Sequence, residues 1–286
     1  RSRTRFRQFF VTWLKAFAAW QWWNFLCSKV PAGKTPLRVN LDETSICLFQ
    51  GNEKGTIFVD KKRPSPVTHV SRGKRRCHLT HVAFICDRAD VQPLLPQVII
   101  GNEATFAAGQ LVALKAMCPP NVHLLRQKSA WNNEVTCAAI VRLLRDALAP
   151  LAHTVQPILL LDAARLHTTR QVLSACNRAC VWPILVPAGV TWLLQPLDTH
   201  VFLRFKLFLS KSYQRAQART VDGDLNIMEF LPCICEAIRS VMQGNSWASA
   251  FGQDGFGDAQ RGVSAFVSKC LEIDGTVEIP TGWPSL

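Results

Sequence analysis

Three aspartates occupy positions at which a purely structural chain would avoid a carboxylate. Asp42 interrupts the strand-like run Val39–Phe49, and Asp162 ends the aliphatic strand Ile158–Leu161. Asp198 stands at the start of a basic amphipathic segment. A buried carboxylate is costly unless it is paired or bound to a cation, and ligands of open α/β sheets bind at the carboxyl ends of strands. Taken alone, Asp162 and Asp198 are each explained by a helix cap.

The expected chemistry changes if one fold brings the three carboxylates together. Carboxylates a few ångströms apart repel one another unless divalent cations lie between them. Two Mg²⁺ ions held by acidic side chains are the usual apparatus for in-line attack on a phosphodiester. The sequence therefore allows two interpretations: separate caps, or one metal-dependent site.

The residues around these aspartates resemble three sequence blocks of the DDE superfamily endonucleases. The blocks are VNLDET at 39–44, LLLDAARLH at 159–167 and VPAGVTWLLQPLD at 186–198. The resemblance is closest to the pogo, jerky and centromere-protein-B-type transposases. The 35 residues between Asp162 and Asp198 (163–197) lie within the spacing typical of that group. Weaker matches extend the resemblance to about residues 37–255.

The resemblance implies an α/β, ribonuclease-H-like mixed sheet flanked by helices, and metal-dependent DNA strand cleavage and transfer. Asp42, Asp162 and Asp198 are then the catalytic residues and the ligands of two Mg²⁺ or Mn²⁺ ions. Supporting roles around those ligands fall to Glu43, His167 and Gln195. Because strand side chains alternate, Glu43 is expected on the face opposite Asp42. A purely structural histidine explains His167 equally well.

Two departures from the family favour an alternative function. Ala163 stands where the family carries Asn, directly after the second aspartate. The first 38 residues are too few for the helix-turn-helix modules that precede such catalytic cores, so we expect either a fragment or a chain that has lost its module. The alternative is a domesticated or decayed nucleic-acid-binding domain that keeps the fold without turnover.

Composition and charge agree with DNA as the partner. The chain has 286 residues, 48% hydrophobic and 19% charged, which excludes a disordered tail and a coiled coil. The formal net charge is +13, and residues 1–38 carry eight basic and no acidic side chains, residues 53–76 eight against two. Each block alone is as well explained by solvated surface, but together they indicate a polyanion. The expected DNA contacts are Lys61, Lys62, Arg63, Arg72, Lys74, Arg75, Arg76, Arg204 and Lys206.

The N-terminal segment is rich in Trp and Phe. We expect a helix over about 6–27, ended by Pro31 and Pro36. Lys15 near its middle favours a partly buried helix over one that docks a membrane or a protein partner. Eleven cysteines without a C-x-x-C pair indicate reduced, mostly buried thiols. Such thiols are typical of a cytosolic or nuclear protein, and the nucleus is the expected location. Many enzymes of the family that the chain resembles act as dimers, so the resemblance allows a homodimer.

The remaining pattern predicts the elements that position the aspartates. Strands are expected at 37–49, 56–59, 78–86, 95–101, 157–162 and 181–187, helices at 131–148, 168–179, 198–218, 225–243 and 246–252, and loops at 60–76 and 188–197. Strands followed by alternating helices and strands imply a mixed sheet with helices on its faces. We expect a basic Trp/Phe-rich segment at 1–36, the catalytic domain at 37–255 and a C-terminal tail at 256–286.

Overall fold

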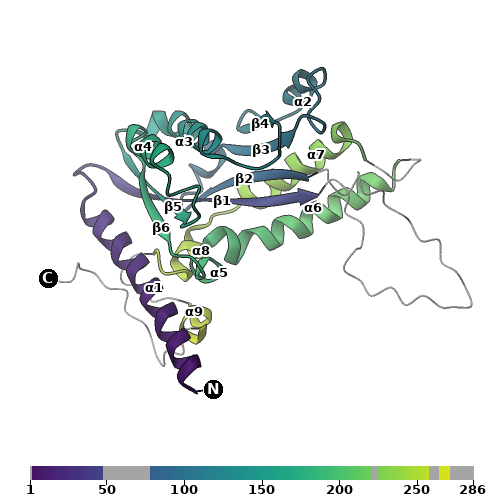
Figure 1. Cartoon of the computed structure of the whole chain (residues 1–286). Helices are drawn as coiled ribbons and strands as arrows, with labels where there is room; N and C mark the ends of the chain where they lie inside the picture. Colours follow the sequence, from purple (N-terminus) through teal and green to yellow (C-terminus); the bar gives the residue numbers. More distant parts are fainter. Residues whose placement is uncertain (1, 48–77, 221–224, 258–263, 271–286) are drawn as a thin grey trace, which may run out of the picture.

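The computed structural model describes residues 2–47, 78–220, 225–257 and 264–270 (Figure 1). Within these residues, six strands form one mixed sheet in the order β4-β3-β2-β1-β5-β6. The strands are β1 (Thr35–Cys47), β2 (His78–Cys86), β3 (Gln97–Asn102), β4 (Val122–Gln127), β5 (Val155–Asp162) and β6 (Trp182–Val186). β2 is antiparallel to both β1 and β3, whereas β5 is parallel to β1, β6 to β5 and β4 to β3. The expected α/β mixed sheet is confirmed.

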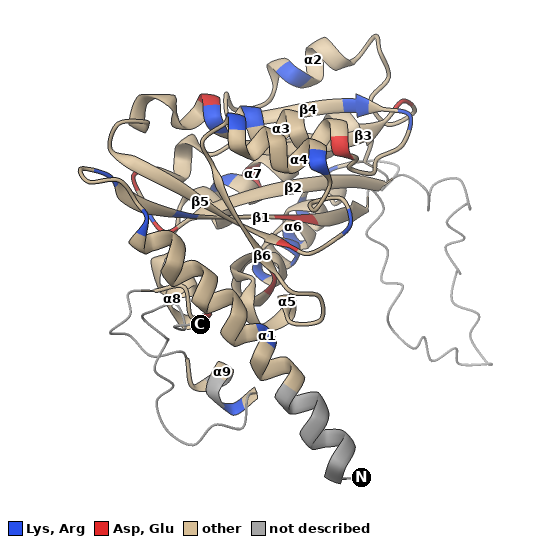
Figure 2. Ribbon diagram, turned by 60° about the vertical axis from the view of Figure 1, so that its left-hand side comes forward, with Lys and Arg blue, Asp and Glu red and all other residues tan. Residues whose placement is uncertain are grey.

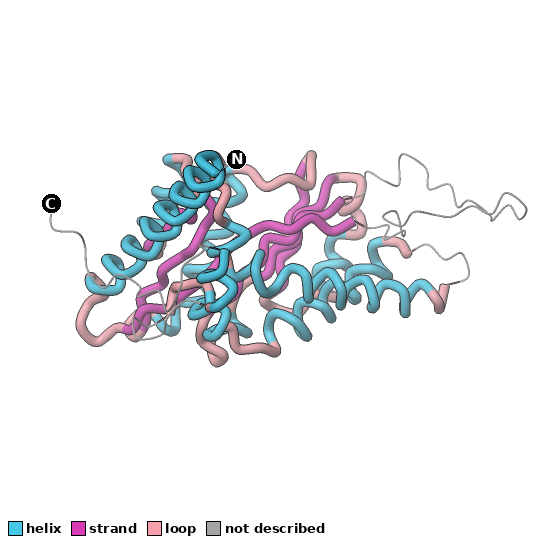
Figure 3. Tube along the Cα trace, turned by 90° about the horizontal axis from the view of Figure 1, so that it is seen from below, coloured by secondary structure: helices cyan, strands magenta, loops and turns pink. Residues whose placement is uncertain are grey.

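Helices cover both faces of this sheet (Figures 1 and 3). One face carries α3 (Glu134–Leu148) and α4 (Arg170–Arg178), and the other carries α6 (Phe202–Gln217), α7 (Ile227–Ala237) and α8 (Ala248–Gln253). The shorter helices are α2 (Leu111–Ala116), α5 (Thr191–Leu194) and α9 (Ala265–Cys270). Tighter or wider turns lie at Gln92–Leu94, Ala149–Leu151, Leu197–Val201 and Ile238–Gln243, the last two of them π-helical.

Strand side chains alternate between two apolar cores, one on each face of the sheet. Val39 and Leu41 of β1 pack in the core that contains α3 and α4. Ile158 and Leu160 of β5 pack in the other core, which contains α6, α7 and α8. Even-numbered positions of β1 and β5 therefore face α6, and odd-numbered positions face α3 and α4.

The Trp-rich segment forms α1 (Ser2–Ser28), which packs against β6. Trp20 and Trp23 are buried in the core on the α6 side, whereas Trp22 is 38% exposed. The N-terminal end of α1 extends beyond the sheet (Figure 1). Among the helices that the structure describes, none has the length and apolar character needed to span a bilayer. The division into segments 1–36, 37–255 and 256–286 stays a prediction.

Several expected elements need correction. The sequence pattern missed β4 and α2, because a short edge strand with alternate half-exposed residues and a one-and-a-half-turn helix carry little periodic signal. The expected loop 188–197 contains α5. The expected helix at 198–218 starts as the π-helical turn Leu197–Val201, and α6 follows it. The expected strand 56–59 and loop 60–76 lie outside the described residues.

The expectation that most cysteines are buried was too strong. Of the described cysteines, Cys86, Cys137, Cys176 and Cys233 are buried, Cys180 is exposed, and the others are half-buried. Four of the half-buried thiols, Cys27, Cys118, Cys235 and Cys270, pack against the edge of one apolar core, where a small apolar side chain is tolerated without full burial.

Candidate active site

Asp42 and Asp162 lie side by side because β1 and β5 run parallel. The register pairs Asn40 with Leu160, so two residues further along Asp42 stands next to Asp162. Both positions are even-numbered and point toward α6. Asp42 is only 9% exposed, whereas the Asp162 side chain at the strand end is 29% exposed. The two carboxylates therefore come from segments 120 residues apart in sequence, and they meet at the carboxyl-terminal end of β5.

Asp198 lies near the same end of β5, on the π-helical turn Leu197–Val201. The backbone N–H of Leu197 donates a hydrogen bond of 2.8 Å to Oδ1 of Asn40 on β1. The carbonyl of Gln195 accepts from the backbone N–H groups of Asp198 (2.8 Å) and Thr199 (3.0 Å). These bonds fix the turn beside the strand that carries Asp42.

The electrostatics show that the three carboxylates interact. Burial, followed by the charge of Asp198, raises the pKa of Asp42 to about 8. Burial and the charge of Asp162 raise the pKa of Asp198, although Lys206 and a hydrogen bond with Asp42 oppose this. At neutral pH Asp42 therefore holds a proton, which is the response expected of a carboxylate that is buried and also faces other carboxylates.

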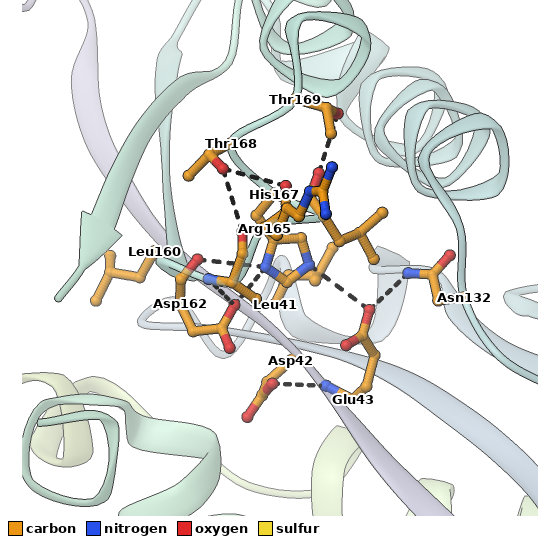
Figure 4. A network of polar contacts seen from close by, with 12 residues as sticks. Leu41, Asp42, Glu43, Asn132, Leu160, Asp162, Arg165, His167, Thr168 and Thr169 are labelled. Carbon is orange, nitrogen blue, oxygen red and sulfur yellow. Dashed lines mark hydrogen bonds and ion pairs between the residues drawn. The ribbon is translucent and has the colours of Figure 1, made fainter. Parts of the chain in front are cut away.

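His167 connects Asp162 to the other face of the sheet (Figure 4). Its Nδ1 lies 2.5 Å from Oδ1 of Asp162, and its Nε2 lies 3.6 Å from Oε1 of Glu43. Asn132 donates to the same Glu43 oxygen at 2.5 Å. Glu43 thus faces α3, opposite Asp42, and its backbone N–H donates to Oδ1 of Asp42 at 2.8 Å.

The ionisation of this pair follows from its contacts. Burial lowers the pKa of His167, but hydrogen bonds with Asp162 and Cys137 and the carboxylate of Glu43 outweigh it and raise the pKa well above its usual range. Burial raises the pKa of Asp162, yet the hydrogen bond and charge of His167 outweigh it, so the net shift is downward. Both shifts describe an imidazolium paired with a carboxylate, which holds one oxygen of Asp162 in place.

The other expected site residues differ in how the structure places them. Gln195 is fully buried, and its side-chain amide has no hydrogen-bond partner among the described residues. Its backbone carbonyl supports the turn of Asp198 instead. Arg204 and Lys206 are exposed on α6. The remaining expected DNA contacts lie outside the described residues: Lys61, Lys62, Arg63, Arg72, Lys74, Arg75 and Arg76.

Asn40 is the residue that sequence reasoning missed. Its side chain is fully buried, and its Nδ2 donates to the carbonyl of Leu160 at 3.2 Å while its Oδ1 accepts from Leu197. Asn40 therefore ties together the three segments that carry Asp42, Asp162 and Asp198. The available signal was the strand period, because a polar residue two positions before Asp42 must share its face.

The donor set fits a divalent cation by its chemistry. Carboxylate oxygens are the ligands that Mg²⁺ and Mn²⁺ prefer, and a cation would offset the repulsion that raises the pKa of Asp42. Within the described residues, no group of three or more His, Cys, Asp and Glu side chains is already closed around a metal-sized position. The carboxylates are thus close enough to interact, and their side chains must turn inward to share an ion.

The sequence comparison agrees with this geometry. Residues 78–250, more than half of the chain, match the family described as DDE superfamily endonuclease. The chain belongs to this family. The part of this DDE superfamily chain that matches contains Asp162 and Asp198, whereas Asp42 precedes it and joins them only through the pairing of β1 with β5.

Comparisons with other proteins give weaker likenesses to this DDE superfamily chain. A "Mos1 transposase paired-end complex with left transposon end" is 15% identical with a TM-score of 0.37, and a "Mos1 mariner paired end complex with Mn" is 12% identical with a TM-score of 0.38. Each alignment covers 84% of this chain and 62% of the other, so the chain spans less than two thirds of those structures. Scores at this level carry no argument. No curated protein matches the sequence.

Proposed function

We propose that this chain is a metal-dependent DNA-cleaving and strand-transferring domain of the pogo, jerky and centromere-protein-B transposase type. The observation that supports it most is the meeting of Asp42, Asp162 and Asp198, which come from three distant segments. They lie close enough together for the charge of Asp198 to add to the effect of burial on Asp42, and for the charge of Asp162 to add to the effect of burial on Asp198, each raising the pKa. Clustered, buried carboxylates lower the stability of the fold, and such clusters are typical of functional sites.

In the proposed reaction, Asp42, Asp162 and Asp198 would bind the divalent cations. Neighbouring side chains would keep these carboxylates in position. Two bound divalent cations supply activation of the attacking hydroxyl and stabilisation of the leaving 3′-oxygen. His167 fixes Oδ1 of Asp162, and the carboxylate of Glu43 lies at ion-pair distance, 3.6 Å, from the other nitrogen of His167. The charge of Lys206 opposes the rise in the pKa of Asp198, so this exposed ammonium lies near the carboxylates and would contact a phosphate of bound DNA in the proposed complex.

The wider parts of the proposal rest on the motif resemblance and the basic charge. They are DNA as the substrate, Mg²⁺ or Mn²⁺ as the cofactor, a homodimer as the working assembly, and the nucleus as the location. In the described part of the chain, lysines and arginines are spread over several elements, α3, α4 and α6 among them (Figure 2). Such charge binds the DNA backbone without reading its sequence.

One observation favours the second candidate function, a decayed nucleic-acid-binding domain without turnover. The carboxylates are not closed around a metal position, and His167 already occupies one oxygen of Asp162. Ala163, where the family carries Asn, removes an amide from the same end of β5.

A thermal-shift measurement in millimolar Mn²⁺ separates the two functions. A metal that binds only the folded state raises its Tm. We expect a rise for the wild type that disappears in Asp162→Ala and persists in Asp146→Ala, which removes an exposed carboxylate from α3. No rise in the wild type, with or without a DNA duplex to supply further ligands, would support the decayed domain instead.

A further inference from the structure

A buried carboxylate outside the proposed metal site contacts the turn that carries Asp198. Asp254 follows α8 directly and is only 2% exposed. Its Oδ2 accepts a hydrogen bond of 2.6 Å from Oγ1 of Thr199, and its Oδ1 lies 3.1 Å from Nε2 of His200. A carboxylate is buried at such a position only when its partners satisfy it, and here both partners directly follow Asp198 in sequence.

The segment held by Asp254 is a π-helical turn, Leu197–Val201. π-helical turns are rare and persist only where the surroundings support them. On the side before Asp198, the support is Asn40 of β1, which accepts from Leu197 at 2.8 Å. On the side after Asp198, the support is Asp254. The turn is thus held at both ends, and Asp198 lies between the two anchors.

The N-terminal helix in turn holds Asp254. Nε1 of Trp20 on α1 donates to the backbone carbonyl of Asp254 at 3.0 Å. The next residue, Gly255, has a φ of +92°, and any Cβ there would collide with the Trp20 indole. Phe256 then packs edge-on against Trp23, with ring centroids 6.2 Å apart. α1 therefore fixes the backbone on which the Asp254 side chain depends.

We propose that Asp254 is a positioning residue for Asp198, and that α1 keeps it in place through Trp20. The inference rests on the proposed function in one respect, namely that Asp198 ligates a metal. It also gives the Trp-rich helix α1 a function, which is to support the position of Asp198. Trp20 and Asp198 are 178 residues apart in sequence.

The test uses the full chain and measures Mn²⁺ affinity by calorimetry, well below the unfolding temperature. Loss of a group that orients a metal ligand costs about 10-fold to 100-fold in affinity, and we expect a loss in this range for Asp254→Ala. Thr199→Val removes one of the two contacts of Asp254, together with the 3.0 Å contact of the same hydroxyl with the Gln195 carbonyl, and should weaken Mn²⁺ binding less than Asp254→Ala does. Thr199→Ser restores the hydroxyl and should restore the affinity. Trp20→Phe, which keeps an aromatic ring but loses the N–H donor and part of the buried volume, should also weaken it.

The matched control is Asp87→Asn, which breaks another buried carboxylate contact. Asp87 pairs with Arg38 at 2.9 Å, at the end of β1 away from Asp42, and its side chain is 9% exposed. This variant should lower the stability without changing Mn²⁺ affinity. If Asp254→Ala and Asp87→Asn change the affinity equally, or if Thr199→Ser does not restore it, the positioning role is overturned.

A metal-free measurement keeps the inference separate from the proposed function. Hydrogen exchange of the peptide spanning residues 195–203 should be faster in Asp254→Ala and Trp20→Phe than in the wild type, and unchanged in Asp87→Asn. Unchanged exchange in the first two variants overturns the inference. A wild type that binds no Mn²⁺ contradicts the proposed function, and the exchange data then still decide whether Asp254 holds the turn.

Discussion

At the scale of single residues, the candidate site depends on a few buried polar side chains whose neighbours determine their charge. Asp42 is the clearest case, because burial and Asp198 raise its pKa to about 8. Its usual value in an unfolded chain is 3.8. The folded protein therefore holds a proton at Asp42 over a pH range in which the unfolded chain has lost it.

This difference predicts a pH-dependent effect of Asp42→Asn. The stability linked to Asp42 is fully present below about pH 4 and is lost as the pH rises toward 8. At pH 8 without metal, Asp42→Asn should therefore have a Tm several degrees above the wild type, and the gap should narrow toward pH 5. Added Mn²⁺ should reverse the order, because only the wild type binds it. Equal Tm values at pH 8 without metal would contradict the assigned pKa.

A second prediction at this scale concerns Asn40. Asn40→Ala removes the acceptor of the buried Leu197 N–H and the donor to the carbonyl of Leu160. Two buried polar groups left without partners should cost about 2–4 kcal/mol in urea unfolding. Asn121→Ala, which removes a single bond to the carbonyl of Leu95, is the matched control and should cost about 1 kcal/mol. A cost for Asn40→Ala no larger than that of the control would show that Asn40 does not tie the three segments together.

At the scale of elements, parallel pairing of β1 with β5 and the turn before α6 bring the site together. Alternation along β1 explains why Asp42 and Glu43 face different helices: Asp42 faces α6, and Glu43 faces α3, where Asn132 holds it. The helix α1 also supports the site, because its buried tryptophans pack against the segment that contacts the turn of Asp198.

The packing of α1 predicts unequal effects for adjacent tryptophans. Trp23 is 2% exposed and packs against Phe256, whereas Trp22 is 38% exposed. Trp23→Ala should lower the free energy of unfolding by about 3–5 kcal/mol, and Trp22→Ala by less than about 1 kcal/mol. Deletion of residues 1–30 should leave a poorly soluble chain. A stable, soluble deletion variant would instead favour a docking role for this helix.

At the scale of the whole molecule, the proposed function requires a basic chain to bring DNA to a cluster of carboxylates. Without bound metal ions or basic side chains nearby, the carboxylates of Asp42, Asp162 and Asp198 would repel DNA phosphates. Lys206 on α6 is exposed and near enough to Asp198 to lower its pKa. Under the proposed function, the exposed face of α6 would therefore guide a DNA backbone to the site.

This arrangement predicts a difference between two exposed lysines in DNA binding. Lys206→Gln should weaken binding to all sequences about equally and reduce the slope of log K against log salt by about 1. Lys115→Gln on α2 neutralises an exposed lysine on an element away from the carboxylates and should change neither quantity. Equal effects of the two substitutions would mean that α6 does not lie on the DNA path. The contribution of the basic block 61–76 stays a prediction.

The sequence by itself predicted most of the local structure and singled out the three aspartates that the structure brings together. The aliphatic run before Asp162 predicts β5, because a strand buried on both faces needs apolar residues at every position. Alternation in β1 predicts opposite faces for Asp42 and Glu43, and three blocks with family-like spacing predict the DDE superfamily, which the match over 78–250 confirms. These features are local, so neighbouring residues suffice to reveal them.

Only the tertiary structure decided what supports the aspartates. Three sets of contacts join residues far apart in sequence. Asn40 bonds to Leu197, Glu43 lies beside the His167 that contacts Asp162, and Asp254 contacts the turn of Asp198. One Asn or Asp looks the same in a sequence whether it caps a helix or holds a distant turn. Its partner is set by strand register and helix packing, and these depend on the burial of both apolar cores at once.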